Sequence, residues 1–164
     1  MPNYSMEDEE YWQNPERFRA MMDAANTAVP NARVTCFPMG DPDLDTTPVA
    51  MMFQMDPGYV VTRHAHACER VEVVVRGSID DGERILYPGA VMVARPGEVY
   101  GPKVAGPDGC LTVEIFSTME GLYVRLSEAE DGHLVSMNFL EHPELLSRAN
   151  NIGGYADANQ VPGS

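Results

Sequence analysis

The sequence predicts an all-β domain, a sandwich or a small barrel, with a short helix at each end. Between residues 49 and 117, short apolar runs alternate with turns rich in Gly, Pro and Asp, which is typical of sandwiches and barrels. A turn at Gly106-Pro-Asp-Gly109 is expected to separate the last two strands. The expected strands are 33–37, 49–55, 59–66, 70–76, 84–87, 90–94, 98–104 and 110–117.

A helix is expected before this strand-rich region. Asn14 and Pro15 form a helix start, because Asn caps helix N-termini and Pro suits the first helical position. Apolar residues then recur at helical spacing and would form one buried face: Phe18, Met21, Met22 and Ala25.

The C-terminal part of the chain carries weaker signals. Residues 123–126 and 133–139 are expected as short strands or partly irregular segments. A helix at 143–149, ended by Gly153-Gly154, would precede a loose tail at 155–164. The chain is therefore divided into an N-terminal arm and helix (1–32), a barrel (33–126) and a C-terminal extension with a short helix and the tail (127–164).

Length, charge and cysteine content exclude several classes of protein. A chain of 164 residues with 44% hydrophobic residues suits one domain with its own core. The net charge of −14 argues against nucleic acid and anionic membranes as partners, because both attract basic surfaces. No stretch approaches the apolar length of a membrane span, and the N-terminus lacks the layout of a signal peptide. Cys36, Cys68 and Cys110 are widely spaced, so free thiols in the cytoplasm are expected.

The pattern with the most functional information is Gly58-Tyr-Val-Val-Thr-Arg-His64-Ala-His66. In a strand, residues two apart point to the same face, so His64 and His66 would converge. Two imidazole nitrogens on one face make half of a transition-metal site. The apolar run 71–75 that follows, closed by Gly77, would be a buried strand ending in a turn.

These spacings resemble the two motifs of the cupin family. Gly58 is followed after five residues by His64, then by His66, and eleven positions later by Gly77, as in the first motif. The stretch from Gly89 to Tyr100 has the frame of the second motif. The resemblance implies a cupin-type double-stranded β-helix, also called a jelly-roll barrel, with short N- and C-terminal helices.

Two departures from the family pattern fall on residues that hold the metal in typical cupins. Arg70 stands where a typical cupin has its metal-binding Glu, and Tyr100 stands where it has its third His. The usual site of three His and one Glu is therefore incomplete, and only His64 and His66 carry over by position. The resemblance, which covers roughly residues 33–118, still implies a divalent metal ion, with iron the expected ion.

Two other side chains are candidates for completing a metal site. Glu83 follows the expected Asp-Asp-Gly turn, and some small cupins resembling dihydroxyacetophenone dioxygenases take a carboxylate from this later strand. Cys68 continues the alternation of His64 and His66, and a thiolate with two imidazoles would suit zinc, copper or iron. The alternatives are an exposed acid beside a turn for Glu83 and a small buried thiol for Cys68.

The two replacing residues are candidates for orienting a substrate. Glu72 shares the strand parity of Arg70, so the pair would form either an ion pair or a clamp for an anionic substrate. Tyr100 would serve as an aromatic wall or as a hydrogen-bond donor to the substrate. The pattern alone does not decide whether Glu114, on the last strand of the barrel, points inward.

The leading hypothesis is a metal-dependent small-molecule enzyme, a non-haem dioxygenase-like oxidoreductase acting on an aromatic or keto substrate. His64, His66 and Glu83 would hold the metal, and Tyr100 and Arg70 would orient the substrate. This chemistry rests on the resemblance, because cupins include isomerases, cyclases, lyases, storage proteins and sensors. The alternatives are a metal-free isomerase or cyclase and a non-catalytic small-molecule-binding module. A homodimer is expected, since cupins often pair through edge strands near the N-terminus and an exposed edge is best covered by a partner.

Overall fold

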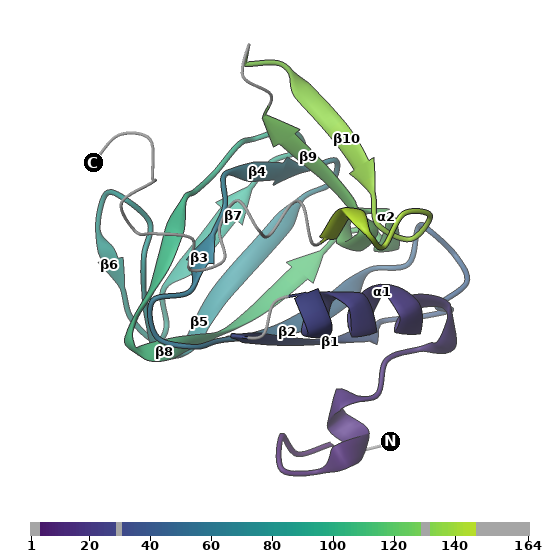
Figure 1. The fold of residues 1–164 in the computed structure, drawn as a ribbon, viewed down its shortest axis with the longest axis horizontal. Coiled ribbons are helices and arrows are strands. Elements are labelled where there is room, and N and C mark those ends of the chain that lie inside the picture. Colours follow the sequence, from purple (N-terminus) through teal and green to yellow (C-terminus); the bar gives the residue numbers. More distant parts are fainter. Residues whose placement is uncertain (1–3, 29–30, 129–131, 147–164) are drawn as a thin grey trace.

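The computed structural model describes residues 4–28, 31–128 and 132–146, which form two antiparallel sheets around a common interior (Figure 1). The all-β prediction is confirmed. The larger sheet has seven strands: β1 (Ala32–Pro38), β2 (Val49–Met55), β3 (Val60–Val61), β5 (Arg70–Asp80), β6 (Ile85–Leu86), β7 (Val91–Ala94) and β8 (Lys103–Phe116). The smaller sheet has three: β4 (His64–His66), β9 (Val124–Glu128) and β10 (Leu134–Asn138).

Strand β8 is the centre of the larger sheet. It pairs with β2 on one edge and with β5 on the other, in the strand order β1-β2-β8-β5-β6. A backbone bridge joins the two sheets, where the N–H groups of His64 and Tyr100 each donate to the other residue's carbonyl oxygen at 3.0 and 2.9 Å. The segment after β7 thereby closes the barrel on β4.

The turn predicted at Gly106-Pro-Asp-Gly109 does not separate two strands. It lies inside β8, which runs as one bent strand across that point. The pairing with β5 shifts there, since Gly77 lies opposite Cys110 whereas Ile79 lies opposite Ala105. The Gly- and Pro-rich residues therefore form a bulge within a paired strand. A bulge, like a turn, needs residues such as Gly that adopt unusual backbone conformations.

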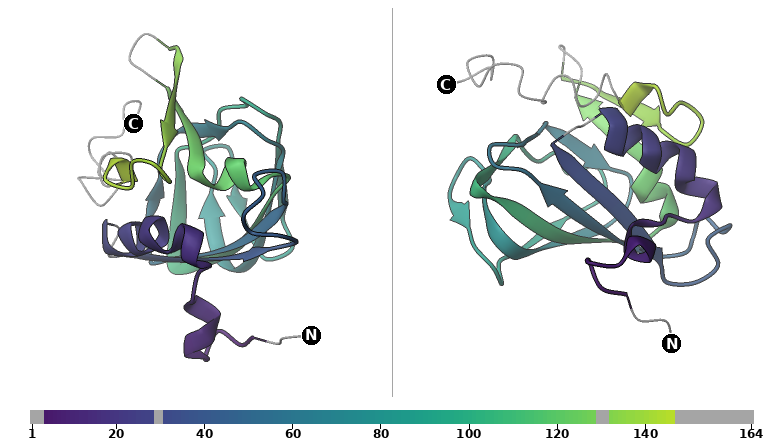
Figure 2. Two further views of the ribbon diagram at one scale, coloured as in Figure 1. Left: turned by 90° about the vertical axis from the view of Figure 1, so that its right-hand side faces the viewer. Right: turned by 60° about the horizontal axis from the view of Figure 1, so that its bottom comes forward.

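Two helices flank β1. Helix α1 (Glu16–Ala28) packs beside β1 and β2, and the 3-10 helix η1 (Glu9–Trp12) lies on the other side of β1, where the Tyr11 and Phe37 rings meet at 5.3 Å between their centroids (Figures 1 and 2). The apolar face predicted for α1 is confirmed. Phe18, Met21 and Met22 are buried in the core cluster, and Ala25 packs against it.

The free edge of β1 is covered from within the chain. Asn26 on α1 accepts a hydrogen bond from the backbone N–H of Val34 at 2.8 Å and donates one to its carbonyl oxygen at 3.3 Å. Asn14, which the sequence predicted as a helix cap, accepts one from the backbone N–H of Cys36 at 3.0 Å. These side chains bind backbone groups that a neighbouring strand would need. This part of the edge is therefore not available for pairing with a strand of a second copy.

A short helix that the sequence did not predict follows β8. Helix α2 (Met119–Tyr123) begins after Thr118, whose hydroxyl accepts a hydrogen bond from the Gly121 N–H at 3.3 Å. A Cβ on Gly121 would lie 2.0 Å from the sulfur of Cys68, so a larger residue here would require the Cys68 side chain to move. The helix is too short for its pattern to show a helical period in the sequence.

The C-terminal predictions fall only partly on the described residues. The strands expected at 123–126 and 133–139 are confirmed as β9 and β10, each with boundaries shifted by one or two residues. The helix predicted at 143–149 extends past Leu146, the last described residue, and the Gly153-Gly154 stop and the tail at 155–164 lie outside the described residues. None of the described helices combines the length and apolar character that crossing a bilayer requires.

Candidate functional site

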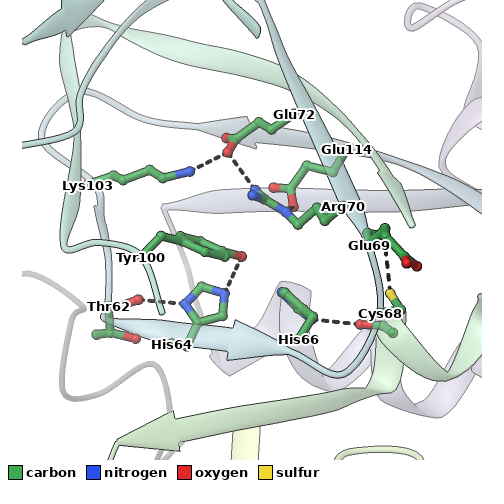
Figure 3. Close-up of polar contacts among 11 residues, drawn as sticks. Thr62, His64, His66, Cys68, Glu69, Arg70, Glu72, Tyr100, Lys103 and Glu114 are labelled. Carbon is green, nitrogen blue, oxygen red and sulfur yellow. Dashed lines mark hydrogen bonds and ion pairs between the residues drawn. The ribbon is translucent and has the colours of Figure 1, made fainter. Parts of the chain in front are cut away.

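A cavity of about 130 Å³ lies inside the barrel, with walls from both sheets. Its apolar side includes Met21 and Met22 of α1 and Met51 and Phe53 of β2. Figure 3 shows how polar side chains converge on the interior from different strands. The polar residues of the cavity wall include His64, His66, Arg70, Glu72, Tyr100, Glu114 and Arg125.

Strand β4 brings His64 and His66 to the cavity, where their ring centroids lie 5.1 Å apart. The Nδ1 atom of His64 lies 2.6 Å from the carbonyl oxygen of Thr62 (Figure 3). Nδ1 of His66 lies 2.7 Å from the carbonyl oxygen of Gly121. A carbonyl oxygen only accepts hydrogen bonds, so each Nδ1 carries the proton and each neutral ring has its lone pair on Nε2.

Burial keeps both imidazoles neutral. It holds the pKa of His64 well below its usual value, aided by the nearby positive charge of Arg125. Burial, with the charge of Arg70, lowers the pKa of His66 to about 3. At neutral pH both side chains therefore add no charge to the cavity.

We expect the free energy of unfolding to fall as the pH is lowered from 7 to 5. Above about pH 6.5 these imidazoles are neutral in both states, but below it the unfolded chain takes up protons that the folded chain excludes. Each buried histidine should lower the free energy of unfolding by about 2 kcal/mol at pH 5. In His66→Asn, the free energy of unfolding measured with urea should therefore depend less on pH. His142→Asn, which removes an imidazole that is 57% exposed, is the matched control. Equal slopes for wild type and His66→Asn would contradict this account.

Tyr100 binds one of the two histidines. Its hydroxyl lies 2.8 Å from Nε2 of His64, and because that nitrogen carries no proton, the phenol is the donor. Burial raises the pKa of Tyr100, so the side chain stays a neutral phenol. The predicted hydrogen-bonding role is therefore directed at a neighbouring histidine, whose lone pair it occupies.

A buried ionic cluster lies on the other side of Tyr100. Arg70 Nε lies 2.6 Å from Glu114 Oε2, and Arg70 Nη2 lies 2.5 Å from Glu72 Oε2. Lys103 forms a further ion pair with Glu72 (Figure 3). All four charged side chains are buried, and the Arg70 and Lys103 charges lie 4.5 and 4.4 Å from the centre of the Tyr100 ring. Of the two alternatives for Arg70 and Glu72, an ion pair or a clamp for an anionic substrate, the structure shows the ion pair.

The register of the central strands explains this cluster. Glu72 on β5 lies directly opposite Glu114 on β8, so two carboxylates meet inside the barrel. Burial opposes ionisation of Glu72, but Arg70 and Lys103 outweigh it and hold the pKa of Glu72 below its usual value. Glu114 shares Arg70 with Glu72, and burial raises the pKa of Glu114. Both carboxylates are already bound to cations and are not free to bind a metal.

The structure does not bring the two further candidates to the histidines. Glu83 is exposed in the turn between β5 and β6, where its backbone N–H donates to the side chain of Asp81 at 3.0 Å. Cys68 is buried, but β4 ends at His66, and the thiol turns to the carbonyl oxygen of Glu69 at 3.3 Å. In the structure Glu83 is an exposed acid beside a turn, and Cys68 is a small buried thiol.

The cavity residues do not form a complete metal site. Among the residues with described positions, no group of three or more His, Cys, Asp or Glu side chains is placed to hold a metal ion. The two imidazoles supply nitrogen ligands, but Tyr100 occupies the lone pair of one of them. Arg70, at the position of the usual glutamate, has only donor groups and offers no oxygen ligand to a cation.

Two buried cations were missed by the sequence reasoning, Lys103 in the ionic cluster and Arg125 in the cavity wall. Lys103 begins β8 and forms an ion pair with Glu72. Arg125 lies on β9 directly opposite His66, is 9% exposed and donates from Nη2 to the hydroxyl of Thr62. The available signal for Arg125 was a single charge in the otherwise apolar run 122–126, because a lone charge inside a buried strand is unusual.

Solved structures with a similar fold include an acetylacetone dioxygenase from Acinetobacter johnsonii. It matches 92% of this chain and 93% of its own, with a TM-score of 0.51 and 13% sequence identity. A protein of unknown function with a cupin-like fold from Ralstonia eutropha matches 73% of this chain and 72% of its own (TM-score 0.49, 15% identity), and KdgF from Halomonas sp. matches 54% and 80% (TM-score 0.44, 28% identity). No family model and no curated protein matches the chain. At this level of identity the likeness to the dioxygenase establishes a shared fold and not a shared chemistry.

Proposed function

We propose that this chain, which has the cupin fold, binds a small organic molecule inside its barrel without a resident metal ion. The observation that carries this proposal is the hydrogen bond from Tyr100 to Nε2 of His64, because it uses a lone pair that a metal would need. The cavity, apolar on one side and polar on the other, has the features of a small-molecule site.

The protonation states favour binding over acid–base catalysis. An efficient general acid or base has a pKa near the working pH. Burial lowers the pKa of His66 to about 3 and raises that of Tyr100, so neither group exchanges a proton readily near pH 7. A non-catalytic binding module, or an isomerase that relies on positioning, suits these groups better than a proton-transfer enzyme.

The size of the cavity limits the ligand. Its volume of about 130 Å³ is close to that of an apolar protein cavity of roughly 150 Å³ that accommodates benzene. A molecule of about six to ten non-hydrogen atoms, with an apolar body and one polar end, would fit such a space.

The test combines metal analysis with ligand binding. Protein purified without a His tag should contain far less than one metal ion per chain, also after incubation with Fe(II), Mn(II), Ni(II) or Zn(II). Benzoate and benzamide serve as probes of suitable size, and calorimetry should show at least one of them binding equally well with and without a chelator. Near-stoichiometric metal that disappears in a His64→Ala/His66→Ala variant would contradict the proposal.

A metal-dependent, dioxygenase-like oxidoreductase is the second candidate, with iron as the expected ion. One observation favours it: both histidines donate from Nδ1 to backbone carbonyls, an arrangement common among metal-binding histidines. His64 and His66 would hold the ion. The Acinetobacter johnsonii acetylacetone dioxygenase, which shares the fold, illustrates the class of reaction.

A single substitution separates the two candidates. Tyr100→His would remove the phenol from Nε2 of His64 and place an imidazole where typical cupins have their third histidine. We expect this variant to gain affinity for Zn(II) or Ni(II) by at least about tenfold over wild type, as measured by calorimetry. Tyr100→Phe, which only removes the hydroxyl, is the control. Tight metal binding by the wild type that neither change improves would favour the second candidate.

We also propose that two copies pair through the outer face of the larger sheet. Val91 and Val93 of β7 are 56% and 68% exposed, and exposed Val75 on β5 and Ile115 on β8 lie on the same sheet. Light scattering should give twice the chain mass of 18.0 kDa, and Val93→Glu should halve that value. Leu44→Glu, at a position 54% exposed in the loop between β1 and β2, should leave the mass unchanged. A wild-type monomer would overturn this proposal.

A further inference from the structure

Arg125 is a buried cation in the cavity wall without an anionic partner in the part of the chain that the structure describes. It is 9% exposed, and its Nη2 donates to the hydroxyl of Thr62. Its Nε has no hydrogen-bond partner among the residues that the structure describes. A buried N–H group without an acceptor is rare in native proteins, so this one requires an explanation.

The other charges around the cavity already balance each other. Arg70 and Lys103 are paired with Glu72 and Glu114 in one closed cluster. The two histidines beside the cluster are neutral. Arg125 therefore adds one positive charge to the cavity that no described side chain neutralises.

Keeping this charge inside the barrel is costly in the absence of a ligand. Burial lowers the pKa of Arg125 to about 10, which reflects how poorly the protein interior solvates its guanidinium. Paired carboxylates stabilise the two other buried cations, whereas the described neighbours of the Arg125 charge are the Thr62 hydroxyl and the aromatic residues Tyr59 and Tyr100. An anion bound in the cavity would supply both the missing charge and the missing acceptor.

We propose that the cavity binds a compact organic anion, a carboxylate or a group of similar charge and shape, through the guanidinium of Arg125. The inference rests on the proposed function, because it names the class of ligand that the cavity takes. A planar guanidinium donates to carboxylate oxygens in a fixed geometry, and Nε of Arg125 is available for such a bond. The apolar wall around Met51 and Phe53 would receive the hydrocarbon part of the ligand.

The experiment compares acids with neutral molecules of the same shape. Benzoate with benzamide, and butyrate with butyramide, are titrated into the full-length protein in Tris-chloride buffer by calorimetry, with inorganic phosphate as a further anion. We expect the acids to bind at least about tenfold more tightly than their amides. Arg125→Met should remove this preference, and Arg95→Met, which removes an exposed arginine outside the cavity wall, should keep it.

The possible outcomes separate this inference from the proposed function. If amides bind as tightly as acids, the anion inference is overturned while the small-molecule site stands. If neither acids nor amides nor phosphate bind, both are overturned. Phosphate that binds more tightly than the carboxylates, with the same dependence on Arg125, supports the inference and identifies a phosphate group as the anion.

Melting temperatures, measured without and with benzoate, give an independent check. Removing an uncompensated buried charge while keeping the length of the side chain should not destabilise the fold. Arg125→Met should therefore melt at the same temperature as wild type or higher in the absence of organic anions. Benzoate should raise the melting temperature of wild type but not that of the variant. A variant that melts well below wild type and still binds benzoate would show that Arg125 is a structural residue.

Discussion

Replacing Arg70 by Met should lower the free energy of unfolding by about 3–5 kcal/mol, the usual cost of breaking a buried ion pair. Arg70 is 3% exposed and binds two carboxylates, with Nε 2.6 Å from Glu114 and Nη2 2.5 Å from Glu72. In the variant, Lys103 still neutralises Glu72, but Glu114 loses the only ion pair that the described residues give it. Urea denaturation at pH 7.5 would measure the loss.

A second substitution should recover part of this stability. In Arg70→Met/Glu114→Leu, both charges are gone and apolar side chains of comparable volume fill the space, which is often neutral or stabilising for a buried pair. We therefore expect the double variant to be more stable than Arg70→Met alone. A double variant less stable than the single one would show that Glu114 contributes through contacts other than its ion pair.

The exposed pair Arg63–Glu128 supplies a matched control. Its Nε–Oε2 distance is 2.5 Å, but the Arg63 side chain is 53% exposed. Arg63→Met should cost no more than about 1 kcal/mol, because water already solvates both charges. Similar losses for Arg63→Met and Arg70→Met would contradict the view that burial determines the contribution of these pairs.

The histidine motif could be predicted from sequence because its geometry is local. Residues two apart in a strand share a face whatever the strand pairs with, so His64 and His66 had to converge once β4 formed. The same rule predicted the pair Arg70–Glu72 within β5. These predictions required only the parity of a single strand.

Predictions that depended on contacts between distant segments were less successful. Arg125 reaches the cavity because β9 pairs with β4 in a register that places it opposite His66, and the sequence gives only weak strand signals there. Glu83 was proposed by analogy with small cupins that take a carboxylate from this later strand. Here β6 (Ile85–Leu86) contains only two residues, and Glu83 is exposed in the turn before it. The bulge in β8 looked like a turn because both use Gly and Pro in the same way.

The ionic cluster also accounts for the carboxylates that line the cavity. Once arginine stands at the position of the usual glutamate, its buried charge requires anions nearby, and Glu72 and Glu114 supply them from adjacent strands. The carboxylates that line the cavity are then used for neutralisation. Among the described residues, Arg125 then remains a buried cation without an anionic partner.

Gly77→Ala should be among the most destabilising single substitutions in the barrel, with a loss of more than about 3 kcal/mol. Gly77 has a φ of +73°, a left-handed conformation that alone costs an alanine about 1–2 kcal/mol. A Cβ at this position would also lie 2.0 Å from the backbone carbonyl oxygen of Gly109, in the bulge of β8. A backbone atom within a paired strand cannot move aside as a flexible side chain would, so the central pairing of β5 with β8 must shift.

Gly82→Ala separates the two causes. Gly82 has a φ of +91° in the turn between β5 and β6, but nothing lies within 4 Å of a Cβ built there. This variant should therefore lose only the conformational part, about 1–2 kcal/mol, in the same urea denaturation experiment. Equal losses in the free energy of unfolding for the two variants would mean that β8 moves away from the new methyl group at little energetic cost. A much larger loss for Gly77→Ala would show that this glycine is required by the close approach of the β8 bulge, a structural reason independent of any ligand.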